Sequence, residues 1–401
     1  MPRLRFTAPA CPPHATVHAI SILVLAASAA AQGAGGSSDR WGAVRDAVDS
    51  YDPIESCVVW VGTAGDPEAF LHKKDGFDRG TVLQVASASK LTTAMAIMSL
   101  VADGVMSLDD TPSRYLPWWT ADPADMRANV TLRHLLSFTS GLIVPRDGTG
   151  SAVPSDCSYS LGWDTAECVR DIYHAGCSTA PGTTFFYSER HMKVAGEMAV
   201  AAAGKKDFND LFDATVLDPL GLRQGLLENT YTPKTNPSPA GGLRCSTSTY
   251  ASILHAYFTH ALLPAATAFE METDPSPGVT VGYSPFSEFE LSYGLGMWIE
   301  GERRLSPGLF GFTPWIDRAS GYYGIIGWYS TAREASAISV GLASNLQPLI
   351  EAALEATPAP TDAPTASPTA PTATAGVGGA RAHLHMAVIV SALVLAMVLL
   401  A

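Results

Sequence analysis

A serine and a lysine stand three residues apart in an apolar stretch of the chain, in the order Ser87-Ala-Ser-Lys90. On a helix, residues at this spacing are neighbours on one face, so the lysine amine can reach the serine hydroxyl. A serine hydroxyl becomes a strong nucleophile when a base takes its proton, and a lysine with a lowered pKa can be that base. The alternative is a lysine that lies along the surface with its ammonium group in water, and these two residues alone do not decide between the possibilities.

An ordered series of further segments follows this pair. Its members are Leu100-Val-Ala-Asp-Gly104, Ser107-Leu-Asp-Asp-Thr111, Tyr115-Leu-Pro117, Thr131-Leu-Arg-His-Leu-Leu136, Thr139-Ser-Gly-Leu142, Pro181-Gly-Thr-Thr-Phe-Phe-Tyr-Ser188, Pro219-Leu-Gly-Leu222, Ala240-Gly-Gly-Leu243 and Tyr293-Gly-Leu-Gly296. The series resembles the serine β-lactamase-like family, which comprises penicillin-binding proteins, class C β-lactamases and related esterases. The resemblance covers roughly residues 55 to 345 in the family's order, which makes it far more specific than any single motif.

The family's second motif, Tyr-x-Asn, falls at Tyr187-Ser188-Glu189. The resemblance implies that Tyr187 shares the proton of Ser87 with Lys90, whereas outside that context a tyrosine here is read as a core residue. Glu189 stands where the family has asparagine, and a glutamate cannot donate an amide hydrogen bond to a substrate carbonyl. Glu189 therefore either pairs with Lys90 or points away in the first turn of a helix, where a carboxylate suits the helix dipole.

The resemblance places the family's third motif, Lys-Thr-Gly or His-x-Gly on a strand, at Ser306-Pro307-Gly308. Gly308 would let a substrate approach the strand closely, and the N–H groups of Leu309 and Ser87 would hold the oxyanion. The family's lysine or histidine supplies a cation that binds a substrate carboxylate in penicillin-binding relatives. Since Ser306 replaces it, we expect a neutral ester or amide as substrate.

Two neighbouring features offer alternatives to this reading of the third motif. Arg303 and Arg304 are a second possible source of positive charge, although we expect them on a solvated turn. Ser320-Gly321 is a competing position for the motif. It is disfavoured because the family's Tyr-Gly-Leu-Gly segment precedes the third motif by only a short strand and a turn.

The resemblance implies a β-lactamase/transpeptidase-like fold of the α/β (α+β) class, in which helices flank an antiparallel sheet and a helical subdomain is inserted between about residues 105 and 240. The expected chemistry is acyl transfer through a covalent intermediate on Ser87, without a metal or an organic cofactor. Two rival interpretations are an inactive cell-surface binding module of the same fold, which Glu189 and Ser306 motivate, and a β-lactamase or D-Ala-D-Ala carboxypeptidase.

The local sequence patterns predict the elements that would position these residues. The expected strands cover residues 57–61, 291–299, 309–316, 322–329 and 337–342, and the expected helices cover 87–102, 189–203 and 349–354. Strands at both ends of the chain and helices in the middle are consistent with a sheet built from both ends around a helical insert.

Composition restricts the class of protein. The chain has 401 residues, is 47% hydrophobic and has a formal net charge of −13. No Lys/Arg-rich stripe is visible, which argues against a nucleic-acid partner. We find no His/Cys cluster at metal-ligand spacing and no G-x-S-x-G nucleophile elbow of an α/β-hydrolase.

Both ends of the chain have the composition of targeting signals. Residues 1–31 read as a secretory signal peptide, and residues 41–356 as the hydrolase domain. Residues 357–380 begin as a Thr/Pro-rich stalk, and residues 381–401 end in a 16-residue apolar run. The run is shorter than the ~20 residues that span a bilayer, so a GPI-attachment signal is favoured over a single transmembrane span. Either anchor places the domain on the outer face of the plasma membrane.

A secreted chain is expected to form disulfides and to carry glycans. Cys157 and Cys168 flank a short polar loop and are the best candidate pair. Cys57, Cys177 and Cys245 could supply a second pair, which would leave one free thiol. Asn129 lies in an N-x-T sequon and is the candidate glycosylation site.

Overall fold

The computed structural model describes residues 39–143, 157, 162–223, 234–286 and 291–356. The predicted signal peptide, stalk and C-terminal tail lie outside these ranges.

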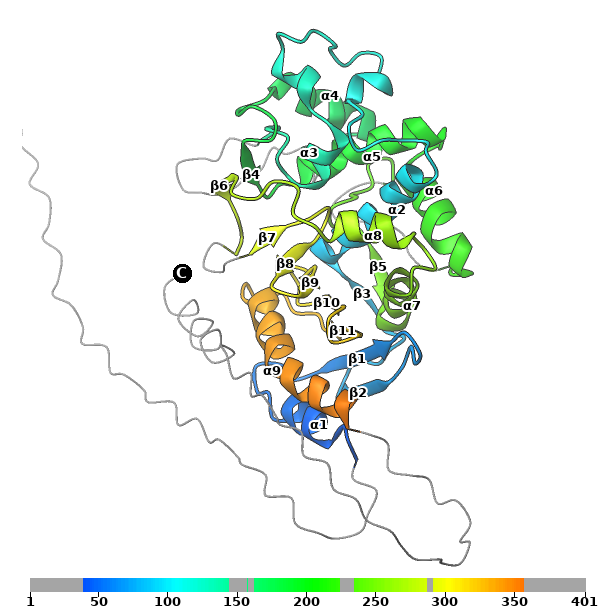
Figure 1. Ribbon diagram of the computed structural model, residues 1–401, viewed down its shortest axis with the longest axis vertical. Helices are drawn as coiled ribbons and strands as arrows, with labels where there is room; N and C mark the ends of the chain where they lie inside the picture. The colour runs from blue at the N-terminus through cyan, green and yellow to red at the C-terminus, as the bar shows by residue number, and fades with distance from the viewer. Residues whose placement is uncertain (1–38, 144–156, 158–161, 224–233, 287–290, 357–401) are drawn as a thin grey trace, which may run out of the picture. The chain divides into compact units, whose positions relative to one another are not determined.

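A seven-stranded antiparallel sheet joins the beginning and the end of the domain, with the strand order β2-β1-β11-β10-β9-β8-β7. Residues Val58 to Thr63 of β1 pair with residues Gly327 to Tyr322 of β11, so blue and orange strands lie side by side in Figure 1. The strands are β1 (Cys57–Thr63), β2 (Phe70–Lys74), β7 (Ser292–Tyr293), β8 (Trp298–Glu300), β9 (Arg303–Leu305), β10 (Thr313–Asp317) and β11 (Tyr322–Gly327). This confirms the predicted sheet built from both ends.

Helices cover both faces of this sheet. Helices α1 (Gly42–Asp49) and α9 (Ala335–Glu355) pack together on one face, and α7 (Thr247–Phe258) packs on β1 and β11 from the other face (Figure 1). The expected strand over 337–342 is wrong, because these residues belong to α9. Its buried residues include Ser339, Leu342, Leu346 and Ile350, a spacing of three to four that is typical of a helix with one apolar face.

Two other predicted strands are interrupted by turns, and a third, predicted over 322–329, ends two residues early at Gly327. The 291–299 stretch is divided into β7 and β8 by a turn, in which Gly296 has φ of +85°. The strand expected over 309–316 begins only at Thr313, because residues 309–311 form a turn. In both cases a glycine-containing turn interrupts an apolar run.

The middle of the chain forms the expected helical subdomain. It contains α3 (Leu132–Leu136), α4 (Thr165–Ala175), β4 (Thr184–Phe186), α5 (Glu189–Ala203) and α6 (Phe208–Phe212). The elements that follow it in the chain are β5 (Arg244–Ser246), α7, α8 (Ala265–Met271) and β6 (Thr280–Tyr283). The strands β4 and β6 pair with each other in a small parallel sheet. The bounds of α5 agree with the prediction.

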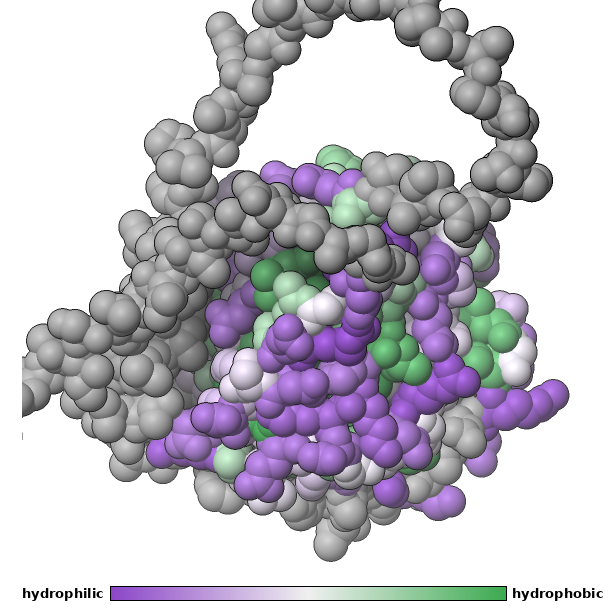
Figure 2. All heavy atoms as spheres, turned by 90° about the horizontal axis from the view of Figure 1, so that it is seen from below, coloured by the Kyte–Doolittle hydropathy of each residue, from purple (hydrophilic) through white to green (hydrophobic). Residues whose placement is uncertain are grey.

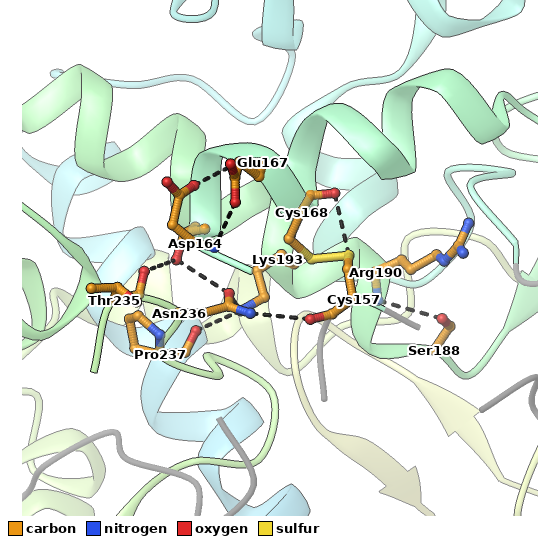
Figure 3. Close-up of a disulfide and its surroundings, with 11 residues drawn as sticks. Cys157, Asp164, Glu167, Cys168, Ser188, Arg190, Lys193, Thr235, Asn236 and Pro237 are labelled. Atoms are coloured by element: carbon orange, nitrogen blue, oxygen red, sulfur yellow. Dashed lines mark hydrogen bonds between the residues drawn. A yellow bond between two sulfur atoms is a disulfide. The ribbon is translucent and has the colours of Figure 1, made fainter. Parts of the chain in front are cut away.

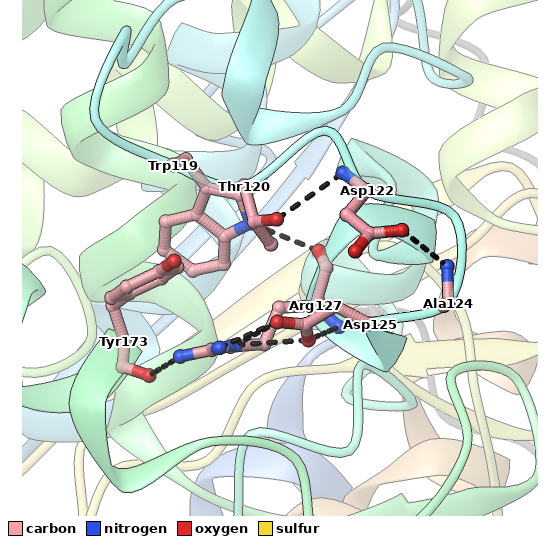
Figure 4. A network of polar contacts seen from close by, with 7 residues as sticks. All are labelled: Trp119, Thr120, Asp122, Ala124, Asp125, Arg127 and Tyr173. Atoms are coloured by element: carbon pink, nitrogen blue, oxygen red, sulfur yellow. Dashed lines mark hydrogen bonds and ion pairs between the residues drawn. The ribbon is translucent and has the colours of Figure 1, made fainter.

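A polar network fixes the segment before α3 onto α4 (Figure 4). The Arg127 guanidinium bonds the Asp125 carboxylate, donates to the Tyr173 carbonyl at 3.1 Å and lies 4.1 Å from the centre of the Tyr173 ring. The indole N–H of Trp119 donates to the Arg127 carbonyl at 2.9 Å. These contacts explain the charged and aromatic side chains of this segment by their role in holding the chain in place, without a part in catalysis.

The central helix of the domain is α2 (Ser89–Ala102), and it is buried on every side. All its residues from Ser89 to Met98 are buried, including the polar side chains of Ser89, Lys90, Thr92 and Thr93. The short strand β3 (Val82–Gln84) pairs with β5 and leads into this helix. A charged side chain near the start of α2 is therefore forced to find its partners inside the protein.

The outer surface is mainly polar where the described residues can be seen. Figure 2 shows mostly hydrophilic side chains on the face at the α1 end of the domain. Among the described residues, no helix has the length and apolar character needed to cross a membrane.

Candidate active site

Ser87 lies in a strained turn at the entrance to α2. It occupies the 3-10 turn Ala86–Ala88, and Ala86 has φ of +45°, in the left-handed region that a residue with a Cβ adopts only at an energetic cost. The turn redirects the chain from β3 into the helix. Ser87 is half-buried between two buried alanines, so its hydroxyl is held in place without being sealed from solvent.

Lys90 points into the protein, which excludes the surface-lysine alternative. The residue is only 1% exposed, and its Nζ lies 3.0 Å from Ser87 Oγ and 2.8 Å from the Ala240 carbonyl oxygen. The close approach of the β7–β8 turn adds to this burial, because a Cβ at Gly296 would stand 2.8 Å from the Lys90 carbonyl oxygen. The amine is therefore within proton-transfer distance of the serine hydroxyl and has a second fixed partner.

Tyr187 lies beside Lys90, between the end of β4 and the start of α5. The Lys90 Nζ is 4.8 Å from the centre of the Tyr187 ring. That ring stacks on Trp298 with centres 5.3 Å apart and meets Phe138 edge-on at 5.2 Å. The structure thus brings Ser87, Lys90 and Tyr187 together from two distant parts of the chain, and the Tyr187 ring is held by aromatic contacts on its other sides.

The support behind Tyr187 includes a histidine that sequence reasoning missed. His191 of α5 is fully buried, with Nε2 2.9 Å from the Phe186 carbonyl, Nδ1 2.8 Å from the Ser140 hydroxyl, and its ring stacked 5.1 Å from Phe138. Burial lowers the pKa of His191 to about 3, so the imidazole is neutral at ordinary pH. Since the carbonyl accepts, Nε2 carries the proton and Nδ1 accepts from the serine. The partner is 51 residues away in the chain, and no local pattern points to it.

Glu189 faces the loop that also receives Lys90. It is the first residue of α5, which is the helix position but not the outward direction that one of the two alternatives predicted, and Ser188 caps that helix. Its carboxylate nevertheless turns inward and lies close to Gly241, since Oε1 would be 3.4 Å from a Cβ built on that glycine. The neighbouring Ala240 carbonyl is the acceptor for Lys90 Nζ. The Glu189 carboxyl group therefore lies at the loop that bonds the proposed base, where the family has an amide.

The segment predicted to be the third motif lies next to Ser87. Ser306 is 3% exposed, and its Oγ donates to the Ser87 carbonyl oxygen at 3.2 Å. Gly308 packs so closely that a Cβ there would stand 2.1 Å from the Val85 carbonyl oxygen. The Leu309 side chain is 58% exposed, and its N–H remains the predicted second oxyanion donor. The segment follows β9 rather than forming part of a strand.

The alternatives near this motif are placed elsewhere. Arg303, expected on a solvated turn, is 7% exposed in β9 because its guanidinium bonds Glu300 and the Ser344 hydroxyl. Arg304 donates to the Glu272 carbonyl at 2.9 Å. Ser320 lies in the turn between β10 and β11, and its hydroxyl donates to Glu351 of α9. Neither arginine has a hydrogen-bond partner that would direct it towards Ser87.

The disulfide Cys157–Cys168 is present, as predicted. The expectation of a second pair is wrong, since Cys57, Cys177 and Cys245 are free thiols. Cys57 lies on β1 of the large sheet and Cys245 on β5 of a different sheet, where each is buried among its own neighbours, while Cys177 is half-buried near the Ser140 carbonyl.

Two further candidate positions can be read from the described residues. Asn129 is exposed at the end of a 3-10 turn, a position open to a glycan. Within the described ranges, no three His, Cys, Asp or Glu residues gather closely enough to hold a metal ion.

Comparison with known proteins finds a match to the Beta-lactamase family over residues 44–363. The chain is 35% identical over 149 residues to esterase EstB of Burkholderia gladioli, an alignment that covers 36% of this chain and 38% of that protein. It is 30% identical over 154 residues to the D-alanyl-D-alanine-carboxypeptidase/endopeptidase AmpH of Escherichia coli K12, covering 38% of this chain and 37% of that protein. The matched segments thus span less than half of these relatives.

Solved structures share the fold over most of the domain. The D-amino acid amidase of Ochrobactrum anthropi superposes with a TM-score of 0.60 at 20% identity, covering 79% of this chain and 98% of that chain. The likeness confirms the predicted architecture, an antiparallel sheet with flanking helices and a helical insert.

Proposed function

This chain is a member of the beta-lactamase family of serine hydrolases, and from that premise we propose that it hydrolyses a neutral ester or amide through an acyl-enzyme on Ser87. The observation that carries the proposal is the 3.0 Å contact between the buried Lys90 Nζ and Ser87 Oγ. A buried amine beside a half-exposed hydroxyl is the arrangement that an activated serine nucleophile requires.

The reaction proceeds in two steps, acylation of Ser87 and hydrolysis of the acyl-enzyme. Ser87 Oγ attacks the substrate carbonyl carbon, and its proton passes through Lys90 and Tyr187 to the departing alcohol or amine. The N–H groups of Ser87 and Leu309 stabilise the oxyanion of each tetrahedral intermediate. Water then adds to the acyl-enzyme carbonyl, gives its proton to the same relay and releases the carboxylic acid, which regenerates Ser87. Apart from the substrate and the water molecule, both steps use groups of this chain.

Preference for a neutral substrate is supported by the charges around Ser87. Ser306 replaces the family's cation, and its hydroxyl is used on the Ser87 carbonyl. Arg303 and Arg304 bond other parts of the chain. The carboxylate of Glu189 faces the neighbouring loop and would repel a second carboxylate. A substrate acid group would therefore meet no compensating cation among these residues.

The test compares substrates that differ in charge. Purified protein and Ser87→Ala are incubated with a p-nitrophenyl ester, a matched ester that bears a free carboxylate, an amide and a β-lactam. We expect turnover of the neutral ester that disappears in Ser87→Ala, and a lower kcat/KM for the carboxylate-bearing ester. Absence of turnover with every substrate would favour the binding-module interpretation, while a preference for the carboxylate-bearing ester or the β-lactam would favour a carboxypeptidase or β-lactamase.

We propose further that the domain is secreted and held on the outer face of the plasma membrane by a GPI anchor or a single C-terminal span. The apolar ends of the sequence and the Thr/Pro-rich stalk support this location, as does a disulfide in the described part of the chain, which is typical of proteins that pass through an oxidising compartment. Treatment of cells with phosphatidylinositol-specific phospholipase C separates the two anchors. Release into the medium would support GPI, and retention on membranes would support the span.

A further inference from the structure

A second lysine, Lys193, is as deeply buried as Lys90. It lies on α5, is 1% exposed, and its Nζ donates to Asn236 Oδ1 at 2.7 Å and to the Pro237 carbonyl oxygen at 2.6 Å. Figure 3 shows the ammonium group directed at this pair of acceptors. Lys193 takes no part in the proposed reaction, so its burial needs a separate explanation.

The acceptors of Lys193 belong to the segment 236–240, which also touches the proposed base. From the side of α2, the Thr93 hydroxyl donates to the Pro239 carbonyl at 2.5 Å, and Lys90 Nζ donates to the Ala240 carbonyl at 2.8 Å. From the side of α5, Lys193 holds the beginning of the same segment. The segment is therefore fixed between two helices, and its last carbonyl is the second fixed partner of the Lys90 amine.

The start of the segment is also tied to the disulfide-bonded part of the chain. Asn236 Nδ2 donates to the Cys157 carbonyl at 3.0 Å (Figure 3). The Thr165 hydroxyl donates to the Thr235 carbonyl at 3.3 Å. Asn236 thus accepts from Lys193 through its oxygen and donates through its nitrogen, which fixes the orientation of its amide.

The hydrogen bonds of Lys193 explain how an ammonium group is accommodated in the interior. Burial of an ammonium group costs several kcal/mol unless charge-assisted hydrogen bonds compensate for it. The two short bonds of Lys193 provide that compensation, and charge-assisted bonds are roughly twice as strong as neutral ones. Their geometric effect is to set the position of a segment that has no regular secondary structure at residues 237 and 238.

We propose that Lys193 is a positioning residue for Lys90, because it fixes the segment whose Ala240 carbonyl orients the Lys90 amine towards Ser87. This inference rests on the proposed function, in which Lys90 accepts the proton of Ser87. A displacement of about 1 Å at a catalytic group can cost on the order of 10²-fold in rate. Loss of this support is therefore expected to slow acylation far more than it weakens substrate binding.

The test uses three variants of the whole protein and a p-nitrophenyl ester. Lys193→Met removes the ammonium group, and with it the bonds to Asn236 and Pro237, at similar volume. Thr93→Val removes the grip on the segment from α2 without a change of charge. Thr92→Val is the matched control, because Thr92 is equally buried and one residue away, and its hydroxyl donates at 3.0 Å to Ser89 of its own helix. The measurements are kcat, KM, the single-turnover acylation rate and the melting temperature of each variant.

We expect Lys193→Met to lower the acylation rate by about tenfold or more and Thr93→Val by about three- to tenfold, both with KM nearly unchanged, while Thr92→Val stays within about twofold of the wild type. If Lys193→Met does not fold, the comparison of Thr93→Val with Thr92→Val decides. Equal acylation rates for these two valine variants, or a folded Lys193→Met with full kcat, would overturn the inference and leave the proposed function intact. A wild-type protein without Ser87-dependent turnover would overturn both.

Discussion

Replacing Gly308 with alanine should separate the third motif from the nucleophile. A Cβ at this position would stand 2.1 Å from the Val85 carbonyl oxygen, whereas ordinary contacts begin near 3.4 Å, so the two backbones must move apart by about 1.3 Å. The Val85 oxygen belongs to the backbone just before the Ser87 turn, so it cannot move aside as the end of a flexible side chain could. The shift carries the Leu309 N–H away from the oxyanion by a similar distance.

The expected effects follow from that displacement. A misplacement of about 1 Å predicts a fall of roughly 10²-fold in kcat/KM, and overpacking of a tight contact predicts a loss of about 1–3 kcal/mol in the free energy of unfolding. Ester hydrolysis and urea unfolding measure the two quantities. Gly65→Ala is the matched control, since a Cβ at Gly65 would meet nothing within 4 Å. If Gly308→Ala kept wild-type kcat/KM, the proposed role of the 306–309 segment in oxyanion binding would be refuted.

Three further predictions concern the base, the thiols and the buried histidine. Tyr187→Phe keeps the ring and removes the phenol oxygen, so kcat should fall by about 10²–10⁴-fold without a change in melting temperature; a kcat close to wild type would exclude Tyr187 from the proton relay. Iodoacetamide should leave Cys57 and Cys245 unmodified in the folded protein and modify them together with Cys177 after unfolding, because burial raises the pKa of Cys57 to about 12 and also raises that of Cys245. Peptide mass mapping would contradict this if it found any two of the three linked. Burial lowers the pKa of His191 from 6.5 to about 3. As the pH falls below 6.5, the imidazole therefore takes up a proton in the unfolded state but not in the folded state. The stability that comes from neutral His191 is complete above pH 6.5 and is lost towards pH 3. Between pH 6 and 4 the free energy of unfolding should therefore fall less steeply with pH in His191→Gln than in the wild type, and the two slopes should differ by about 1.4 kcal/mol per pH unit. Equal slopes would be inconsistent with a buried neutral imidazole.

The part of the site that sequence reasoning could anticipate consists of local patterns. Ser87 and Lys90 are close because they are three residues apart at the start of one helix, whereas this spacing alone does not show that Lys90 points inward. The bounds of α5 were predictable because an N-terminal cap precedes a long helix-favouring run. The disulfide between Cys157 and Cys168 closes a short local loop.

The missed features depend on tertiary contacts. His191 finds Ser140 across 51 residues, and Lys193 finds Asn236 across 43, so neither pair is visible in a local window. Arg303 is buried because α9 returns to cover β9, a contact that no local composition reveals. The 337–342 stretch of α9 contains β-branched residues that favour a strand in isolation, and only the whole helix shows the spacing of its buried face.

The central claim is that Ser87 carries the acyl group during turnover. Intact-mass measurement of the protein during the first turnovers of a p-nitrophenyl ester tests it most directly, with Ser87→Ala measured beside it. We expect a mass increase equal to one acyl group. Peptide mapping should locate it on the peptide that contains Ser87, and it should be absent from Ser87→Ala. An acyl group on another residue, or turnover that Ser87→Ala retains, would contradict it.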